Sequence, residues 1–404
     1  MLYLFITIKN IGDNNVNKLR LYKILLLTTS LSFISTTSYA KDFLSAQDYN
    51  KSGLRGFNIG LLSDHDDAYY QELSATKANI VRVIVPFNYC TAKDVSNQKI
   101  KVNDEKDISA DKLSPTPSCV YEVNTKNKES LKKLLTAGTQ YGFYVLPVAS
   151  FEQKSQGDFW TDAHLQQGMV NAWKNFASSY KDYSTIAGYD LLYSPNNMGL
   201  PQGADSKKYW KQGATYIIKA IREVDKKHPV IFETTPYADP STLSSFTPFD
   251  DDNIVYAFNM YYPYDITLQG TNEAYGYRVP YPAGLEYGVQ PFPDQPPRAV
   301  DIKDLRLFLK DAAVWSVSNK VPILVTEFGI AHWAPNGSAF RYISDTTKIF
   351  EENGWSWINQ GFRISKAMDP YIASDDPNDT SRSPEAPVIS VLKDSFKNNT
   401  LSPK

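Results

Sequence analysis

The chain of 404 residues has few of the residues that bind metals or form cross-links, with two cysteines and four histidines. These residues are scattered without the spacing of a ligand set, so no metal site is expected. Acidic and basic residues nearly balance at a net charge of −2, which gives no reason to expect nucleic acid as a partner. No glycine-rich phosphate loop follows the first predicted strand, and the sequence indicates no cofactor.

An apolar run near the N-terminus is too short to span a bilayer. Residues 24–35, ILLLTTSLSFIS, follow three basic residues and precede SYA at 38–40, the small-x-small pattern of a cleavage site. We interpret residues 1–40 as an N-terminal extension with a secretory signal peptide, and an uncleaved membrane anchor is the alternative. The mature chain is then 41–404, secreted or periplasmic, with no transmembrane span after cleavage.

Both cysteines, Cys90 and Cys119, belong to one polar segment of the predicted mature chain. An even number of cysteines in an exported protein favours a disulfide. The bond would close a loop of roughly thirty residues and contribute about 3–4 kcal/mol in the chain-entropy treatment.

Short apolar runs alternate with longer amphipathic runs to the end of the mature chain. Eight of the apolar runs are predicted strands: 54–60, 79–85, 143–149, 186–192, 229–234, 254–261, 322–328 and 355–360. Helical patterns lie between most of them. This alternation predicts an α/β protein, a closed parallel (β/α)8 TIM barrel forming one domain over 41–404. An open doubly wound sheet is the structural alternative.

Aromatic residues and proline are abundant, with 27 tyrosines and 24 prolines in the chain. Many gather in residues 262–300, which show neither helical nor strand periodicity. Because functional residues of a barrel lie on the loops after the C-terminal ends of the strands, long loops are expected at that face. The segment is either an aromatic wall of a cleft or a proline-stiffened cap over the barrel mouth.

Six segments at the predicted strand ends carry a resemblance to a known family. They are RGFN (55–58), NIVRV (79–83), YDLLYSP (189–195), FNMYYPYDITLQG (258–270), ILVTEFG (323–329) and GWSWINQGF (354–362). Their order resembles the cellulase-type barrels of glycoside hydrolase family five over nearly the whole mature chain. The resemblance implies a β-linked glycan or oligosaccharide as ligand and retaining hydrolysis by two carboxyl groups.

The resemblance implies that Glu327, in the TEFG turn that ends strand seven, is the nucleophile. Arg82 matches the strand-two arginine that supports this glutamate in the family. A purely structural ion pair between Arg82 and Glu327 is the alternative interpretation.

The acid/base glutamate of the family closes strand four in an N-E-P sequence, where this chain has Tyr193, Ser194 and Pro195. A serine hydroxyl does not ionise usefully near neutral pH and cannot replace general acid catalysis, which is typically worth ~10²–10⁴-fold. Tyr193 takes the position of the asparagine that contacts the sugar's 2-hydroxyl in the family. Glu233, at the end of strand five, is the best surrogate acid. Three weaker candidates are Asp190, Asp265 and His332.

Strands six and eight also depart from the family. Strand six keeps Tyr261 of the H-x-Y pattern but has Asn259 in place of the histidine. At strand eight the tryptophan that forms the sugar platform falls on Gln360, while Trp355 and Trp357 are interpreted as strand core. A shift of one or two positions would make Trp357 the platform. The resemblance assigns substrate binding to the positions of Arg82, Tyr193, Asn259, Tyr261, Gln360 and Trp357.

We therefore expect an exported, catalytically impaired relative of the family-five glycosidases that acts by binding a glycan or a protein partner. The first alternative is an active retaining β-glycosidase or endo-β-glycanase with Glu327 as nucleophile and a displaced acid such as Glu233. The second is a non-catalytic envelope scaffold that binds no sugar. Whether the protein is an enzyme stays open, and the sequence identifies no protein partner.

Overall fold

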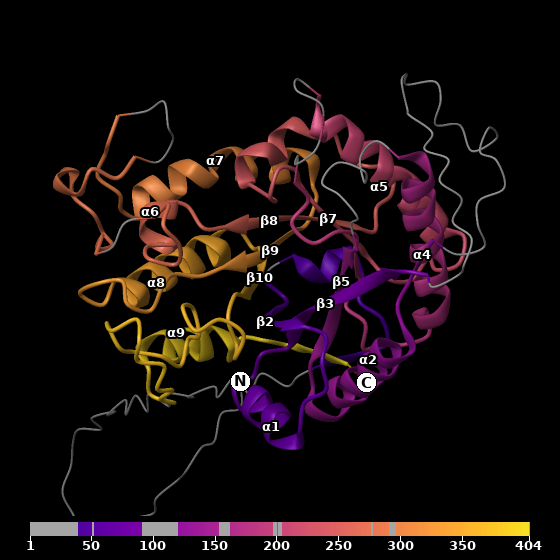
Figure 1. The fold of residues 1–404 in the computed structure, drawn as a ribbon, viewed down its shortest axis with the longest axis horizontal. Helices are drawn as coiled ribbons and strands as arrows, with labels where there is room; N and C mark the ends of the chain where they lie inside the picture. The colour runs from indigo at the N-terminus through magenta and orange to yellow at the C-terminus, as the bar shows by residue number, and fades with distance from the viewer. Residues whose placement is uncertain are drawn as a thin grey trace, which may run out of the picture. The chain divides into compact units, whose positions relative to one another are not determined.

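The structure is a computed structural model that describes residues 39–50, 52–90, 120–152, 162–196, 200, 204–275, 278–290 and 296–403. In these ranges eight parallel strands form a closed barrel (Figure 1). Strand β2 (Arg55–Leu61) pairs with both β3 (Ile80–Tyr89) and β10 (Ser356–Asn359), which closes the sheet. The other five follow in chain order: β5 (Tyr144–Phe151), β6 (Tyr189–Asp190), β7 (Val230–Glu233), β8 (Ile254–Met260) and β9 (Ile323–Phe328). The predicted TIM barrel is confirmed.

The strand predicted over 186–192 is regular only at its centre, where β6 has two residues. Its flanking residues still donate backbone hydrogen bonds to both neighbouring strands, from Leu191 to Ile231 and from Tyr193 to Ala149. One further short strand, β4 (Tyr121–Glu122), pairs antiparallel with the end of β3. The irregular end of β6 matters because residues 193–195, where the resemblance predicted the acid, come three residues after it.

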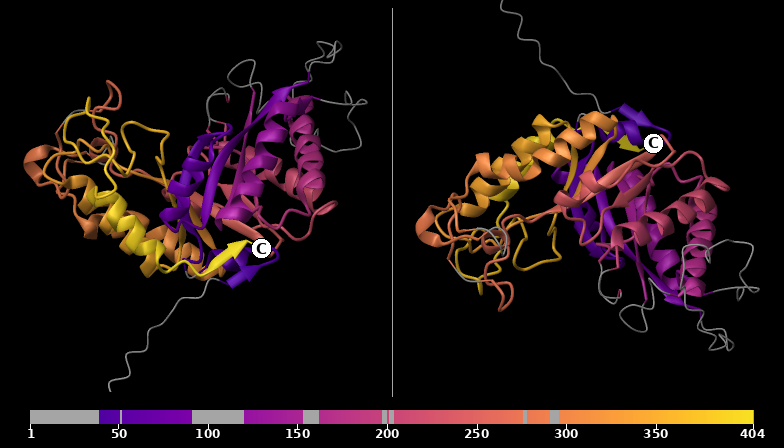
Figure 2. Two further views of the ribbon diagram at one scale, coloured as in Figure 1. Left: turned by 90° about the horizontal axis from the view of Figure 1, so that it is seen from below. Right: turned by 90° about the horizontal axis from the view of Figure 1, so that it is seen from above.

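The helices lie around the outside of the strands (Figures 1 and 2). The long ones are α1 (Asp67–Ala75), α2 (Thr125–Tyr141), α4 (Ala163–Tyr180), α5 (Ser206–Arg222), α7 (Ile302–Asn319), α8 (Ser338–Glu352) and α9 (Pro387–Phe396). Five of them begin after an Asp or Asn whose side chain accepts a backbone N–H of the first turn, as the sequence preference for such caps predicts. The described part of the chain also contains four shorter helical turns: η1 (Ala46–Tyr49), η3 (Pro240–Ser245), α6 (Tyr264–Thr267) and η4 (Leu285–Tyr287).

The interior of the barrel is apolar at one end and polar at the other. Ile80 of β3 belongs to a buried cluster with Tyr49 of η1, whose hydroxyl donates to the carbonyl of Ala187 at 3.0 Å. Successive strand residues point to opposite faces, so Arg82 shares the inward direction of Ile80. Its guanidinium therefore lies above the apolar layer, toward the C-terminal ends of the strands.

The two ends of the described chain meet in a small parallel pair. Strand β1 (Tyr39–Lys41) pairs with β11 (Leu401–Pro403), and Figure 2 shows the yellow C-terminal strand beside the indigo N-terminal one. This pair includes the predicted boundary between residues 1–40 and 41–404, which stays a prediction. Within the described ranges no helix has the length and apolar character to cross a membrane. Cys119 lies outside the described residues, so its pairing with Cys90 also stays a prediction.

Candidate functional site

A cavity of about 530 Å³ opens at the C-terminal ends of the barrel strands. Its walls come from the ends of β6, β8, β9 and β10, from the loops after β8 and β9, and from the segment after β10. The described lining residues are Tyr193, Tyr261, Leu268, Gly270, Thr271, Glu327, Trp333, Gln360, Ser365, Lys366, Ala367, Met368 and Pro377. The volume falls in the range usual for small-molecule sites.

Glu327 is the one carboxylate among these described lining residues. It lies near the end of β9 and is 5% exposed. Its Oε1 accepts a hydrogen bond from Nη1 of Arg82 at 3.1 Å, and its Oε2 accepts one from the Tyr261 hydroxyl at 3.1 Å. Both contacts fix the orientation of the carboxylate at the inner end of the cavity. The predicted partners Arg82, Tyr261 and Glu327 are thus brought together.

Arg82 holds two further carboxyl groups that do not line the cavity. Its Nε donates to Oδ2 of Asp190 at 2.8 Å, and its Nη2 donates to Oε1 of Glu233. Its Nη1 also donates to Oδ1 of Asn58 at 3.3 Å. Asp190 and Glu233 are both fully buried. One guanidinium therefore faces three carboxyl groups. If all three were ionised, their negative charges would outnumber the single positive charge of Arg82.

The environment of this cluster favours the protonated state of its buried acids. Burial raises the pKa of Asp190 to about 6, assisted by the charge of Glu327 and opposed by Arg82. Burial, together with the charges of Asp190 and Glu327, raises the pKa of Glu233 well above its usual range despite Arg82. Burial by itself would lower the pKa of Arg82, but the three carboxyl groups raise it, so the guanidinium stays charged.

Glu233, the predicted surrogate acid, has both oxygens engaged. Oε1 accepts from Arg82, and Oε2 accepts the backbone N–H of Ser194 at 2.9 Å. The Glu233 carbonyl is also bonded, to the indole N–H of Trp210 at 2.8 Å. Burial and these contacts separate the Glu233 carboxyl from the cavity, so direct protonation of a ligand by Glu233 requires a rearrangement.

Ser194 occupies a backbone conformation that few non-glycine residues adopt, with φ of 44°. The N–H bond to Glu233 holds this turn, so the carboxyl at the end of β7 supports the backbone at the position where the resemblance predicted the acid. The preceding residue, Tyr193, lines the cavity. The centroid of its ring lies 5.3 Å from the guanidinium carbon of Arg82, and burial together with the charge of Glu327 raises the pKa of Tyr193.

Asn259 has a supporting role. Its Oδ1 accepts from the Thr326 hydroxyl at 2.8 Å, and its Nδ2 donates to the Tyr237 carbonyl at 3.3 Å. It joins the end of β8 to β9 and to the loop after β7, and it is not among the described lining residues of the cavity. The side chain that touches Glu327 is Tyr261, which follows β8 directly, and its own pKa is raised by burial and by that carboxylate.

Gln360 lines the cavity at the end of β10, the position predicted to replace the platform tryptophan. Trp357 is fully buried between Phe328 and Phe396, and its Nε1 donates to Glu351 at 2.9 Å. Trp355 is also buried. Both tryptophans are core residues of the strand, which agrees with their interpretation as strand core and leaves Trp357 no free face for a ligand.

Trp333 was not among the predicted site residues. It follows TEFG by four residues and is the tryptophan among the described lining residues. Its loop position gave no periodic signal. The nearby His332, a weaker acid candidate, is buried with Nδ1 2.6 Å from the carbonyl of Ser374, so it faces away from the cavity lining.

The tyrosine-rich segment 262–300 contributes Leu268, Gly270 and Thr271 to the cavity wall. Its described tyrosines are absent from that lining. Tyr262 and Tyr281 are buried, and their hydroxyls donate to carboxylates of the adjoining helices. The segment is thus a cavity wall in which two buried tyrosines stabilise the loop through their hydrogen bonds.

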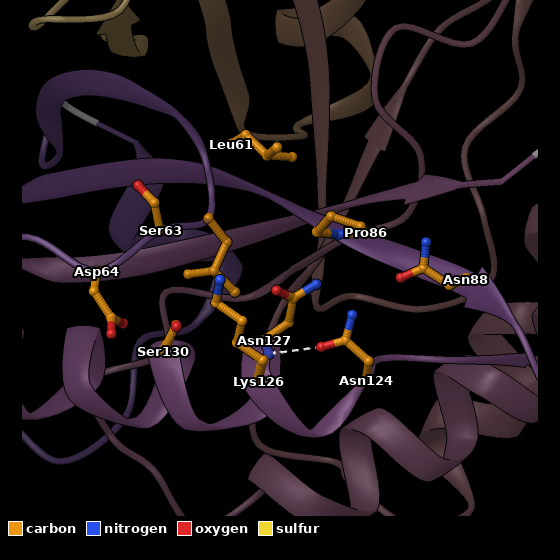
Figure 3. A pocket seen from close by; sticks show the side chains of 10 residues that line it. Leu61, Ser63, Asp64, Pro86, Asn88, Asn124, Lys126, Asn127 and Ser130 are labelled. Carbon is orange, nitrogen blue, oxygen red and sulfur yellow. Dashed lines mark hydrogen bonds between the residues drawn. The ribbon is translucent and has the colours of Figure 1, made fainter.

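A second cavity of about 440 Å³ lies between the ends of β2 and β3 and the start of α2 (Figure 3). Two of its polar side chains have structural roles. The Asn124 side chain accepts the N–H of Asn127 at 2.8 Å and caps α2. Asp64 accepts from Lys133 at 2.8 Å. Among the described residues, none of those predicted to bind substrate lines this cavity.

The described part of the chain contains no cluster of His, Cys, Asp or Glu suited to hold a metal ion.

The sequence profile of Cellulase (glycosyl hydrolase family 5) matches residues 45–362, well over half of the chain. The chain belongs to this family. Its place in glycosyl hydrolase family 5 agrees with the closed parallel barrel.

Named relatives agree with this assignment. Endoglucanase 3 of Fibrobacter succinogenes is 27% identical over 224 residues, covering 50% of this chain and 33% of that protein. Endoglucanase C of Acetivibrio thermocellus is 26% identical over 238 residues, covering 54% of this chain and 67% of that protein. The match thus spans about a third of the first relative's length.

Among solved structures, Thermotoga maritima Cel5A in complex with cellobiose superposes with a TM-score of 0.62. The superposition covers 86% of this chain and 99% of that chain at 19% identity. At this identity the likeness supports the barrel fold of the family.

Proposed function

We propose that this family 5 protein binds a β-linked glycan at the Glu327 cavity and hydrolyses it poorly. The observation that carries the proposal is the position of the carboxyl groups. Glu327 is the one carboxylate among the described lining residues, while Asp190 and Glu233 are fully buried and bonded to Arg82. Retaining hydrolysis needs two carboxyl groups about 5–5.5 Å apart, on either side of the bond that breaks.

The missing contribution is proton donation to the leaving group. Ser194, where the family resemblance expects the acid, supplies a hydroxyl that cannot act as an acid near neutral pH. Tyr193 does not replace it, because burial and Glu327 raise the pKa of its hydroxyl further. Glu327 keeps the geometry of a nucleophile, held by Arg82 and Tyr261. Attack on an activated glycoside therefore remains chemically accessible.

The first experiment measures binding and turnover separately. Isothermal titration with cello- and manno-oligosaccharides is expected to show binding. Hydrolysis of the same sugars is expected to be at least ~10²-fold slower than by a family member with both carboxyl groups, assayed in parallel. Hydrolysis at a comparable rate would overturn the proposal. Manno-oligosaccharides are included because the Thermotoga maritima protein has also been solved with mannotriose.

The second experiment tests Glu327 itself. An activated 2-fluoro glycoside needs little acid assistance, so it is expected to label Glu327 covalently, as read by mass spectrometry of the peptide. The Glu327→Gln variant is the matched control and is expected to stay unlabelled. Labelling elsewhere, or equal labelling of the variant, contradicts the assigned role.

A second candidate function is an active retaining glycosidase with Glu233 as displaced acid. One observation favours it, because a raised pKa at Glu233 is the property that a general acid needs. The test is Glu233→Gln. A large loss of turnover at unchanged binding affinity supports this alternative, whereas a loss of folding stability without any measured turnover supports the structural role. Absence of glycan binding in every assay would favour the envelope scaffold.

Export remains part of the proposal. The sequence predicts a secretory signal peptide in residues 1–40. The relatives are named as endoglucanases, and a polymeric glycan is too large and polar to cross a cell membrane unaided. N-terminal sequencing of protein recovered from the periplasm or medium tests export, with Lys41 as the expected first residue.

A further inference from the structure

One side of the cavity is formed by an indole ring. Trp333 lines the same space as Glu327 and Tyr261, on the loop that follows β9. The described lining residues provide no other tryptophan, since Trp355 and Trp357 are buried in the core behind β10. The position expected to present a ring, at the end of β10, holds Gln360 instead.

The Trp333 ring is held in place from two directions. Its indole N–H donates to the carbonyl of Gln269 at 2.8 Å, which ties it to the loop after β8. The ring also packs edge to face against His332, with centroids 4.9 Å apart at 79°. His332 is itself fixed, because its ring contacts the Ser374 carbonyl and its backbone N–H donates to the carbonyl of Ala367 at 2.7 Å.

A fixed ring is suited to bind a rigid ligand because little conformational entropy is lost on binding. Pyranose rings of β-linked hexoses present C–H groups on their flat faces and hydroxyls at their edges. An aromatic ring offers a large apolar surface of matching shape. With the sugar stacked on the indole, the hydroxyls at the edge of the sugar ring would contact the polar groups of Glu327 and Tyr261 at the inner end of the cavity.

We propose that Trp333 is the stacking platform of this site and that it binds the apolar face of a neutral hexopyranose, in place of a ring at Gln360. The inference rests on the proposed function, because it assumes that the cavity binds a glycan. A neutral sugar is the chemistry that fits the inner end of the cavity, because the carboxylate of Glu327 lines it and opposes an anionic group there.

The test compares two substitutions of one residue. Trp333→Phe keeps an aromatic face but loses the N–H that bonds to Gln269. Trp333→Leu removes the aromatic face and keeps an apolar side chain. Titration of a cello-oligosaccharide is expected to give an affinity at least about tenfold weaker for Trp333→Leu and within about threefold of the parent for Trp333→Phe. A purely structural role of the indole N–H predicts instead that both variants weaken binding equally.

Trp315→Leu is the matched control. Trp315 on α7 also donates its indole N–H to a backbone carbonyl, that of Phe246 at 2.9 Å, but it does not line the cavity. Its replacement is expected to leave the affinity unchanged while lowering thermal stability. Equal affinity of the parent and Trp333→Leu would overturn the inference and leave the proposed function standing. Absence of glycan binding by the parent protein would overturn both.

Discussion

At the residue scale, the centre of the molecule is the group of acids around Arg82. A guanidinium with five N–H donors can bond several carboxyl groups at once, which a lysine cannot do with the same geometry. Arg82 uses three of its nitrogens on Asp190, Glu233 and Glu327. Because three negative charges around one positive charge are unfavourable when buried, the cluster retains a proton more readily than separate carboxyl groups would.

Asp190 gives the first prediction, on the pH dependence of stability. Its pKa is raised from 3.8 to about 6 in the folded protein, so between these values the folded chain holds a proton that the unfolded chain has released. The free energy of unfolding is therefore expected to fall as the pH rises from about 4 to about 6. Urea unfolding at a series of pH values measures this slope, and Asp190→Asn is expected to flatten it.

Asp225 is the internal control for that experiment. Although burial opposes the charge, the hydrogen bonds from His228 and Tyr189 lower the pKa of Asp225 to about 2. Its contribution to stability is therefore present above about pH 4 and lost as the pH falls toward 2. Asp190→Asn should leave this acid-side loss unchanged. A slope between pH 4 and 6 that is identical in the parent and the variant would contradict the assignment to Asp190.

At the scale of elements, the barrel depends on close contact between β2 and β3. Gly56 pairs with Ile80 in the register of the two strands. A Cβ at position 56 would overlap the Ile80 carbonyl oxygen, far inside any allowed contact. Gly56→Ala is therefore expected to destabilise the fold by at least about 3 kcal/mol, at the upper end of the cost of overpacking, as measured by thermal or urea unfolding.

The same substitution at two helix positions should have opposite effects. Gly142 ends α2 with φ of 81°, a conformation that alanine adopts only with strain, whereas Gly213 lies inside α5 with open space around its Cβ direction. Gly142→Ala is expected to cost about 1–2 kcal/mol. Gly213→Ala is expected to stabilise by about 0.5–1 kcal/mol, because alanine favours the helix. Gly213→Ala also serves as the control for Gly56→Ala, and destabilisation by it would contradict the structural explanation.

At the scale of the whole molecule, export and the predicted disulfide are linked. If Cys90 and Cys119 pair after export, the oxidised protein contains no free thiol and is more stable than the reduced form by about 3–4 kcal/mol. Thiol titration under denaturing conditions and unfolding with and without reductant measure both quantities. The Cys90→Ser, Cys119→Ser double variant should match the reduced parent. Two free thiols in exported protein would contradict the pairing.

Much of the fold and part of the site could be predicted from local sequence, because neighbouring strands of the barrel follow one another in the chain. Each apolar run and each helical pattern is set by residues close in the chain, and the eight predicted strands all occur in the structure. Glu327, near the end of one predicted strand, and Arg82, inside another, meet as expected. The sequence also determined that position 194 carries no acid.

Only the tertiary structure decided which side chains from separate strands contact one another. It brought Asp190 and Glu233 onto Arg82, buried both, and turned the second oxygen of Glu233 to the Ser194 N–H. It also made Trp333, on a loop without periodicity, part of the cavity, and by burying Trp357 it decided between the core and platform interpretations of that residue. These outcomes depend on contacts between residues far apart in the chain. Local sequence determines where each strand forms, but it does not determine which side chains meet across the barrel.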